Sequence, residues 1–260
     1  MMAVIEVWYL AHSGFALETS DRLLIFDYYL DSPDPEAGNK RGNNSGDDKK
    51  ARSLATGVVS PDEIRNKKVI VFSSHRHPDH FNPVILSWKK ELENSDFFLS
   101  TDIPKKYHRD WTHLLKPHQT YENDILKIQT FQSTDEGVAF LIDIGGISIY
   151  HAGDLNWWHW HGEPSAWNKD MEARFKREVA QIGNSSIDVA FLAADPRQED
   201  AALWGMTYFL DHVNVKIAFP MHFWNDYSIM DSIRSEAKIH PELNKVKCIS
   251  GRGQHFTLTV

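Results

Sequence analysis

Short apolar runs alternate with polar segments along most of the chain, and the runs have the length of β-strands. Residues 7–10, 23–26 and 69–74 form three early runs, and residues 187–194 and 215–219 form two later ones. Runs of roughly four to eight residues, bounded by polar or turn-forming residues, are typical of buried strands. The pattern therefore predicts a protein built around buried β-strands.

A hairpin and an amphipathic helix are predicted from local spacing. Gly145 and Gly146 separate the apolar runs 138–144 and 147–150, and a Gly-Gly pair readily supplies the positive φ angles of a tight hairpin turn. Apolar residues recur at helical spacing between 165 and 182, which predicts a helix with one buried face.

Two further helices are predicted from their start signals. Ser60 precedes a proline, and Glu63 follows three residues after it; this is a helix start with a cap and a first-turn proline. Asn82 also precedes a proline and predicts a helix over 84–93.

The predicted organisation is one domain over residues 1–260, with packed sheets and helices outside them, because no repeat or linker divides the chain. Residues 31–59 are rich in Pro, Gly, Asn, Asp and Lys and are predicted to form a long flexible loop. This loop is either a surface insertion or a lid over a site within the domain.

Composition narrows the class of protein. The net charge of −8 argues against a broad nucleic-acid surface. A single cysteine, Cys248, excludes an intrachain disulfide framework and any multi-cysteine metal site. No signal peptide is visible and no apolar run approaches about eighteen residues, so a soluble cytoplasmic protein without a membrane span is expected.

Possible metal ligands are most concentrated in the segment 74–80, Ser-His-Arg-His-Pro-Asp-His, at the end of the predicted strand 69–74. His75 and His77 stand two apart and can converge on one metal ion. Asp79 and His80 can face a second ion close by. Two neighbouring divalent ions can make hydroxide from water at neutral pH.

Other predicted strands also end at residues whose side chains can bind a metal ion or take part in catalysis. If these strands share a direction relative to one edge, their terminal residues gather beside the histidine cluster. One histidine after a strand is usually structural, but a set of such residues around this cluster predicts a metal site. The set comprises His12, Asp27, His151, Asp154, Asp195 and His222.

These residues resemble the metallo-β-lactamase superfamily. The H-x-H-x-D-H motif is followed in order by Asp154, in His-Ala-Gly-Asp, and by His222, in Phe-Pro-Met-His. The segment 9–15, Tyr-Leu-Ala-His-Ser-Gly-Phe, is similar to the Trp-Leu-Gly-His opening of one branch. That branch includes ascorbate-6-phosphate lactonase and N-acyl phosphatidylethanolamine phospholipase D. The resemblance implies an α/β fold, the αββα sandwich with two mixed β-sheets flanked by helices, and a metal-dependent hydrolase.

The resemblance also implies a dinuclear site that binds two divalent metal ions, with zinc expected first and manganese or iron as alternatives. By the family pattern, Asp154 would bridge the two ions. His75 and His77 would bind the first ion, and Asp79, His80 and His222 the second.

One family ligand is missing. The family supplies a further histidine to the first metal, but residues 128–137 contain none. Asp135 is the preferred replacement, because a carboxylate can bind a hard metal ion; Ser133 or Gln132 could occupy the position without binding strongly. His113 and His118 rank below Asp135. An oxygen ligand would weaken the first site or shift it toward manganese or iron.

The chemistry implied by the family is attack by a metal-held hydroxide on a carbonyl carbon or on phosphorus. Asp79 can hold the proton of the nucleophile while it binds metal. His151 is a candidate acid for the leaving group, and it could equally be a strand residue that faces away from the site.

Four residues are candidates for substrate binding, each with a structural alternative. His159 and His161, in the Trp-rich segment 156–163, could form a substrate wall or help to plug the loop. His12 could sit beside the metals, where it supports a ligand or contacts the substrate, or it could be a buried histidine that bonds backbone. Arg197 could hold an anion or form a turn with a surface salt bridge, and the turn is favoured.

Three functions remain open. The first is a hydrolase of a small phosphorylated or lactone-type metabolite. The second is a phosphodiesterase that acts on nucleic acid or a phospholipid. The third is a non-catalytic metal- or ligand-binding protein with a weakened first site. A small-molecule partner is expected, without nucleic acid, for a monomer or a homo-oligomer. The basic, aromatic segment 105–111 is a weak nucleic-acid signal, and a surface patch is the favoured interpretation.

Overall fold

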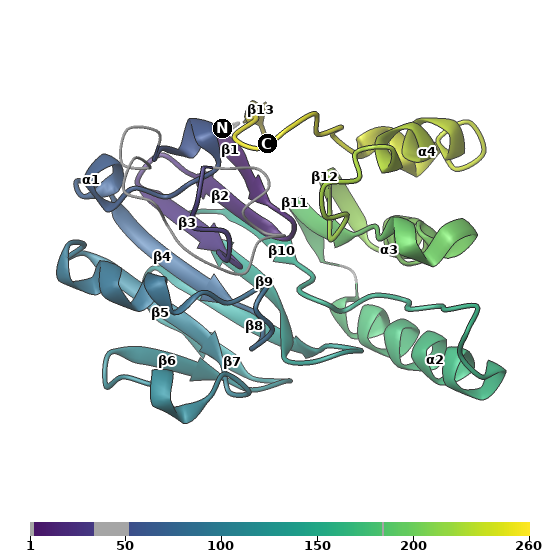
Figure 1. Cartoon of the computed structure of the whole chain (residues 1–260), viewed down its shortest axis with the longest axis horizontal. Coiled ribbons are helices and arrows are strands. Elements are labelled where there is room, and N and C mark those ends of the chain that lie inside the picture. The colour runs from purple at the N-terminus through teal and green to yellow at the C-terminus, as the bar shows by residue number, and fades with distance from the viewer. Residues whose placement is uncertain (1–2, 34–51, 184) are drawn as a thin grey trace. The chain divides into compact units, whose positions relative to one another are not determined.

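The computed structural model describes residues 3–33, 52–183 and 185–260. The chain forms two compact units: residues 1–114 with 250–260, and residues 115–249. Each unit is built on one mixed β-sheet (Figure 1). The two sheets and their helices confirm the predicted fold class. The prediction of a single domain over 1–260 stays a prediction.

The first unit contains a seven-stranded sheet in the order β13-β1-β2-β3-β4-β5-β6. The pairs β13–β1, β1–β2 and β2–β3 are antiparallel, whereas β3–β4 and β4–β5 are parallel. The strands are β1 (Val4–Ala11), β2 (Gly14–Glu18), β3 (Arg22–Phe26), β4 (Lys68–Ser73), β5 (Ser95–Ser100), β6 (Thr112–Leu115) and β13 (His255–Thr259).

Short helices connect these strands. They are η3 (Leu54–Thr56), α1 (Pro61–Ile64), η4 (Pro83–Lys90) and η5 (Lys105–Tyr107). The predicted start at Asn82 is confirmed, since its side chain accepts the backbone N–H of Val84 at 3.0 Å. The element that follows is a 3₁₀ helix ending at Lys90 rather than a helix running to residue 93.

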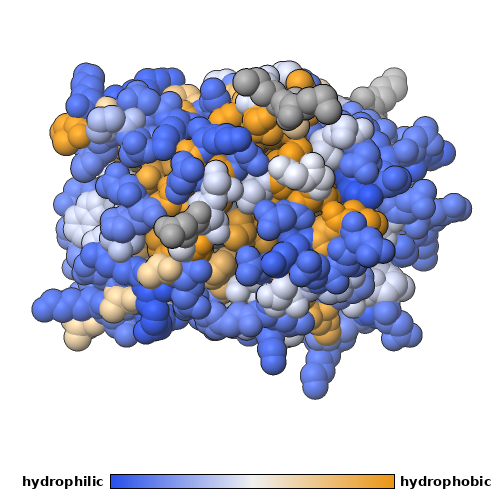
Figure 2. Space-filling model, turned by 180° about the vertical axis from the view of Figure 1, so that it is seen from behind, coloured by the Kyte–Doolittle hydropathy of each residue, from blue (hydrophilic) through white to orange (hydrophobic). Residues whose placement is uncertain are grey.

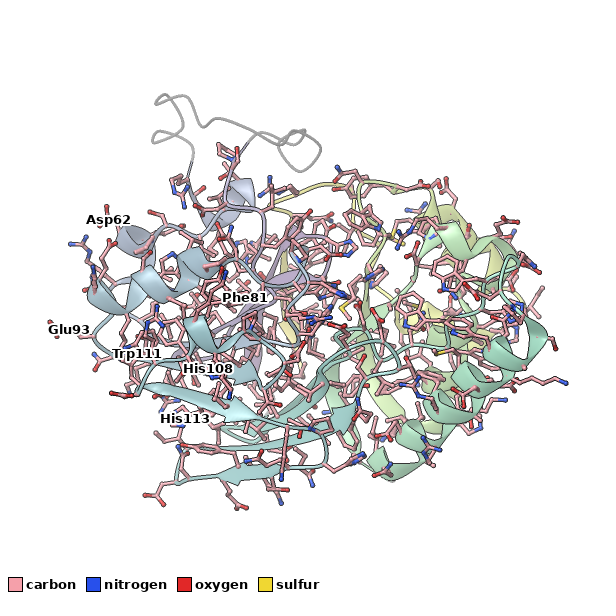
Figure 3. All side chains as sticks on the ribbon, turned by 60° about the horizontal axis from the view of Figure 1, so that its bottom comes forward. Asp62, Phe81, Glu93, His108, Trp111 and His113 are labelled. Carbon is pink, nitrogen blue, oxygen red and sulfur yellow. The ribbon has the colours of Figure 1, made fainter. Side chains whose placement is uncertain are left out.

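Aromatic packing covers the sheet of the first unit. Trp88 of η4 is 1% exposed and packs on Tyr28 with ring centroids 4.9 Å apart. Trp111 and His113, drawn in Figure 3, contact the β5 residues Phe97 and Phe98. His113 therefore takes part in packing on β5.

The second unit contains a six-stranded sheet in the order β12-β11-β10-β9-β8-β7. The pairs from β7 to β10 are antiparallel, and the pairs β10–β11 and β11–β12 are parallel. The strands are β7 (Thr120–Glu122), β8 (Leu126–Gln132), β9 (Val138–Ile144), β10 (Ile147–His151), β11 (Ser186–Ala193) and β12 (Asn214–Met221).

The helices of the second unit are α2 (Ser165–Ile182), η6 (Pro196–Ala201), α3 (Trp204–His212), α4 (Ile229–Glu236) and η7 (Pro241–Lys245). Of these, α3 lies beside β11 and β12 and η7 beside β12, while α2 packs on α3 and α4 packs on η7 (Figure 1). The predicted helix 165–182 is confirmed, and it buries the apolar side chains that keep helical spacing. The predicted hairpin is also confirmed, with φ of 59° at Gly145 and 81° at Gly146.

The predicted loop 31–59 falls largely outside the described residues, since 34–51 are not among them. Its described ends belong to the first unit. Arg52 forms an ion pair with Asp31, and Leu54 and Val59 are buried.

Hydrophilic residues cover most of the face drawn in Figure 2, and apolar ones appear between them. The large apolar side chains that are exposed are Val4, Ile125, Trp204, Trp224 and Ile239. None of the helices in the described part of the chain combines the length and apolar character that crossing a membrane requires.

Candidate metal centre

The first unit gathers its polar strand ends at one sheet edge. β1, β3 and β4 run in one direction, because β1 and β3 both pair antiparallel with β2, and β3 pairs parallel with β4. His12, Asp27 and His75 follow these strands or end them. The expected gathering is therefore confirmed within this unit. His12 and Asp27 have positive φ angles of 53° and 42°, a strained backbone that is common at functional sites.

Asp27 is the organising residue of this edge. Its carboxylate accepts the backbone N–H of Ser74 at 2.7 Å and the Ser74 hydroxyl at 2.6 Å. It also accepts Nδ1–H of His80 at 2.8 Å, and neither Asp27 nor His80 is exposed. This bond fixes the proton of His80 on Nδ1, so that Nε2 can bind a metal ion. The expected contact between Asp27 and one of the predicted ligand histidines is therefore present. That His80 binds a metal ion stays a prediction.

The same network orients His75. Since the Ser74 hydroxyl donates to Asp27, it accepts from Nδ1 of His75, 3.0 Å away. Nε2 of His75 then lies 3.1 Å from Nδ1 of His77. Two nitrogens bound to one tetrahedral zinc at about 2.0–2.1 Å stand roughly 3.3 Å apart. The two side chains therefore fit ligands of one ion.

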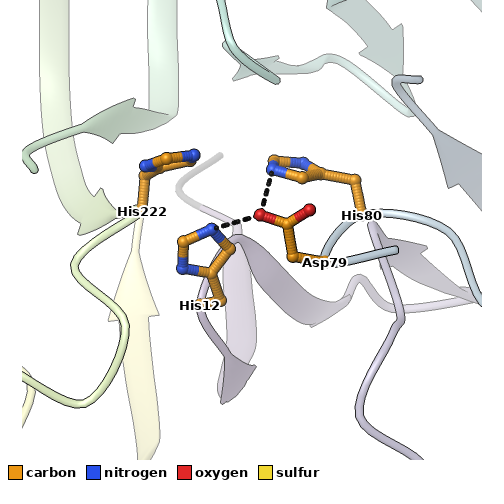
Figure 4. Close-up of side chains that lie close together, drawn as sticks. All are labelled: His12, Asp79, His80 and His222. Carbon is orange, nitrogen blue, oxygen red and sulfur yellow. Dashed lines mark ion pairs between the residues drawn. The ribbon is translucent and has the colours of Figure 1, made fainter. Parts of the chain in front are cut away.

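His12, Asp79 and His80 form a second group, whose ligand atoms lie within 4.8 Å of one another. Figure 4 shows the ion pairs that Asp79 makes with both histidines. Asp79 Oδ2 lies 3.3 Å from Nε2 of His12 and 3.8 Å from Nε2 of His80. The rings of His75 and His80 are 4.1 Å apart, so the two groups adjoin in the first unit.

His12 was not assigned as a metal ligand from the sequence. It was predicted to sit beside the metals as a support for a ligand or as a substrate contact, or to be a buried histidine that bonds backbone. The structure buries it, and its ring also offers a metal-ligand atom beside Asp79. Its position at the end of β1 was the available signal.

The second unit holds a smaller set of ligands. Asp154 and His222 follow β10 and β12, and Oδ1 of Asp154 lies 3.4 Å from Nε2 of His222. His222 Nδ1 is 3.0 Å from the carboxylate of Asp195, which follows β11. Burial lowers the pKa of His222, but Asp154 and Asp195 outweigh it and raise the pKa to about 10. A metal ion bound at Nε2 of His222 would displace the proton from that nitrogen.

Arg197 supports the carboxylate that orients His222. Its guanidinium donates to both oxygens of Asp195, at 2.9 Å and 3.0 Å from Nε. Burial raises the pKa of Asp195, but hydrogen bonds from His222 and Arg197 outweigh it and hold the pKa at about 2. The favoured interpretation, a turn with a surface salt bridge, is matched only in part: Arg197 lies in the short 3₁₀ helix η6 and pairs with Asp195, which is buried. Substrate binding by Arg197 stays a prediction.

Asp135, the predicted replacement for the missing histidine, is exposed. Among the described residues it belongs to no group of ligand atoms that lie within 4.8 Å of one another. Its neighbour Thr134 bonds the carbonyls of Asp154 and Asn156 at 3.2 and 2.7 Å. The segment is thus tied to the Asp154 loop, but the structure lends Asp135 itself no support as a ligand.

The other predicted site residues have definite surroundings. His151 is buried and accepts the backbone N–H of Gly153 at 3.2 Å, which places its ring proton on Nε2. His159 packs against Trp204, with ring centroids 4.7 Å apart. His161 pairs with Asp200 at 2.7 Å. Their catalytic and substrate-binding roles stay predictions.

The family model described as the beta-lactamase superfamily domain matches residues 6–159. This chain belongs to that superfamily. A comparison with curated protein sequences finds no match.

Solved structures show the metallo-β-lactamase fold. Igni18, a metallo hydrolase from the archaeon Ignicoccus hospitalis, is 17% identical, with a TM-score of 0.62 over 98% of each chain. The metallo-β-lactamase fold protein YhfI from Bacillus subtilis is 13% identical, with a TM-score of 0.58 over 98% of this chain and 99% of that one.

A structure of different activity has the same fold. The diiron β-hydroxylase CmlA from Streptomyces venezuelae is 12% identical, with a TM-score of 0.56 over 99% of this chain and 54% of its own. The family and these structures confirm the predicted superfamily and support a metal-dependent hydrolase. The predicted branch stays a prediction.

Proposed function

We propose that the protein is a hydrolase that uses two divalent metal ions to attack a small phosphorylated or lactone-type metabolite. The observation that carries the proposal is the ligand network of the first unit. There, Asp27 and Ser74 hold His80 and His75 with their Nε2 atoms available for a metal. Ligand histidines fixed through their other nitrogen are the usual arrangement in protein metal sites.

The proposed assignment of ligands combines the family pattern with the donor sets of the two units. His75 and His77 would hold the first ion, and Asp79, His80 and His222 the second, with His12 as a further donor. Asp154 would serve both ions, as the family pattern implies. An imidazole-rich set favours zinc, whereas manganese or iron gains from added oxygen ligands.

Bound divalent ions lower the pKa of a water molecule and polarise the bond under attack. The chain's own residues provide orientation and proton transfer. Asp79, whose side chain is 21% exposed, can accept the proton of the attacking water. His151 is the candidate group at the leaving atom, where Nε2–H of its neutral ring could donate a hydrogen bond to the developing charge.

Support for a small substrate comes from the loop after Asp154. Trp160 is half-buried and stacks on the buried Trp158 with centroids 6.0 Å apart, and the guanidinium of Arg197 lies 5.7 Å from the ring of Trp160. Flat aromatic surface beside a cation suits a small anionic or polar molecule.

A phosphodiesterase that acts on nucleic acid is the second candidate, favoured by a groove in the first unit. This groove of about 460 Å³ is lined by Lys89, Lys90, Tyr107, Arg109 and Trp111 among others. Basic and aromatic side chains together can hold a phosphate backbone and stack bases. The net charge of −8 keeps this candidate second. Non-catalytic metal binding remains the third, because residues 128–137 lack the further histidine of the family.

The test is metal content by elemental analysis, beside turnover of bis-p-nitrophenyl phosphate and of a simple lactone. Two metal ions per chain with turnover of either substrate are expected. Asp154→Asn should lose metal and turnover together, whereas Asp143→Asn, on the exposed side of β9, should keep both. No turnover after added zinc or manganese would contradict the proposal. Metal-dependent cleavage of oligonucleotides alone would move the second candidate ahead.

A further inference from the structure

A cavity in the second unit contains none of the proposed metal ligands. Its volume is about 550 Å³, within the range of about 300–1,000 Å³ usual for small-molecule sites. Its lining is formed by η6, α3, α4 and the loop after Asp154. The lining residues that matter are aromatic or acidic, namely Trp157, Trp204, Tyr208, Glu199, Asp211 and Glu236.

Three acidic residues of the cavity lie outside the lysine and arginine ion pairs of the described residues, and Glu199 helps to raise the pKa of His161 after the hydrogen bond and charge of Asp200. Among the described residues, no lysine or arginine forms an ion pair with Glu199, Asp211 or Glu236. A fourth lining carboxylate, Asp200, pairs with His161. The cavity is therefore electronegative at neutral pH.

The acidic residues are too dispersed for a metal ion. Glu199, Asp211 and Glu236 come from three different helices. In the described part of the chain, they belong to no group of ligand atoms within 4.8 Å of one another. A divalent ion needs several oxygens in one coordination shell, so this lining suits a larger cation.

The aromatic residues already hold an ammonium group within the protein. The Nζ atom of Lys176 lies 4.2 Å from the ring centroid of Trp157 and 5.0 Å from that of Tyr208. Trp204 packs on Trp157 at 5.5 Å, and it is 37% exposed. Lys176 does not line the cavity, and its ion pair with Glu172 balances its charge within that pair.

We infer that this cavity binds an organic ammonium ion, with Trp204 and Trp157 as its aromatic wall and Asp211, Glu236 and Glu199 as its counter-charges. Aromatic faces combined with carboxylates are the usual means of recognising a quaternary ammonium group. A hydrated metal ion gains little from aromatic faces, and an anion would be repelled. The inference stands apart from the proposed hydrolysis.

The test is calorimetric titration of the whole chain with choline and with 3,3-dimethylbutan-1-ol, its neutral carbon isostere. Choline should bind saturably at one site per chain. The neutral isostere should bind about tenfold more weakly or worse, since it lacks both the cation–π attraction and the ion pairing.

Variants locate the site. The double change Asp211→Asn with Glu236→Gln should weaken choline binding about tenfold. Trp204→Leu should weaken it as well. Asp231→Asn is the matched control, because it removes a charge from the same helix α4 outside the lining; it should bind choline like the wild-type chain. Circular dichroism checks that each variant is folded.

Three outcomes would overturn the inference. They are equal binding of choline and its isostere, unchanged binding by the double variant, and displacement of choline by calcium at equal concentration. The experiment measures binding of choline. The inference therefore holds or fails independently of whether the protein turns over a hydrolase substrate.

Discussion

The two units share one strand connectivity but supply their ligands differently. In the first unit, β1, β2 and β3 are antiparallel neighbours, and β3, β4 and β5 are parallel. In the second, β8, β9 and β10 are antiparallel, and β10, β11 and β12 are parallel. The carboxyl ends of parallel strands meet at one edge, so each unit has an edge suited to a site.

The first unit concentrates its ligands, and the second spreads them. Four ligand candidates of the first unit lie in the single loop 75–80 after β4. The second unit takes the ligand candidates Asp154 and His222, and Asp195 that orients His222, from the loops after three successive strands. A dense loop can be recognised from sequence as a motif, whereas a dispersed set needs the sheet to unite it.

Both units orient a histidine with a buried aspartate, but they stabilise the carboxylate by different partners. Asp27 receives neutral donors from Ser74 besides His80. Asp195 receives the charged guanidinium of Arg197 besides His222. The same function is thus served by neutral hydrogen bonds in one unit and by an ion pair in the other.

The largest effect is expected for Asp27→Ala. It leaves the Ser74 N–H and hydroxyl and His80 Nδ1–H buried without their acceptor, which should cost about 3 kcal/mol of stability and abolish most metal binding. Urea unfolding and metal analysis measure the two effects. Asp21→Ala is the control, because Asp21 is an exposed carboxylate before β3. A similar loss of stability and metal binding in this control would contradict the role of Asp27 as the organising residue.

Asp195→Asn should have the next largest effect. The amide keeps the shape of the carboxylate but loses its charge, so metal affinity should fall about 10- to 100-fold with the fold retained. Competition with a chelator measures the affinity. If Asp195→Asn binds metal like the wild-type chain, the parallel between Asp27 and Asp195 does not hold for function.

Arg197→Gln should change the acid stability rather than the fold. The pKa of Asp195, held at about 2, should rise toward its ordinary 3.8. A depressed carboxylate pKa contributes stability above pH 3.8 that is lost as the pH falls toward 2. The variant should therefore unfold at higher pH within this window. Ser74→Ala, which removes a neutral donor in the other unit, serves for contrast in the same acid titration.

The smallest effect is expected for Asp200→Asn. The hydrogen bond and charge of Asp200 raise the pKa of His161 above 6.5, so the variant should titrate nearer that value by NMR. The raised pKa makes the pair stabilising below pH 6.5, an effect lost as the pH rises through the folded pKa. The hydrogen bond from His161 lowers the pKa of Asp200 below 3.8. The stabilisation by the pair is therefore also lost as the pH falls through this lowered pKa. An unchanged His161 titration would contradict this pairing.

The elements that sequence predicted are those with strong local signals. The run 69–74, the Gly145-Gly146 hairpin and the helix 165–182 each depend on spacing or turn preference within a short window. The short strand β13 was not predicted. It pairs with β1 across almost the whole chain, and Arg252 beside it donates to the carbonyls of Leu10, Ser32 and Gly57.

The sequence by itself determined which side chains carry ligand atoms, because H-x-H-x-D-H and the ordered Asp154 and His222 are local facts. The tertiary structure decided which of them are oriented. Asp27 and His80 meet across 53 positions and Asp195 and His222 across 27, and His12 joins Asp79 from another strand. Such contacts depend on strand pairing, since hydrogen-bond geometry is set by the sheet and not by neighbours in the chain.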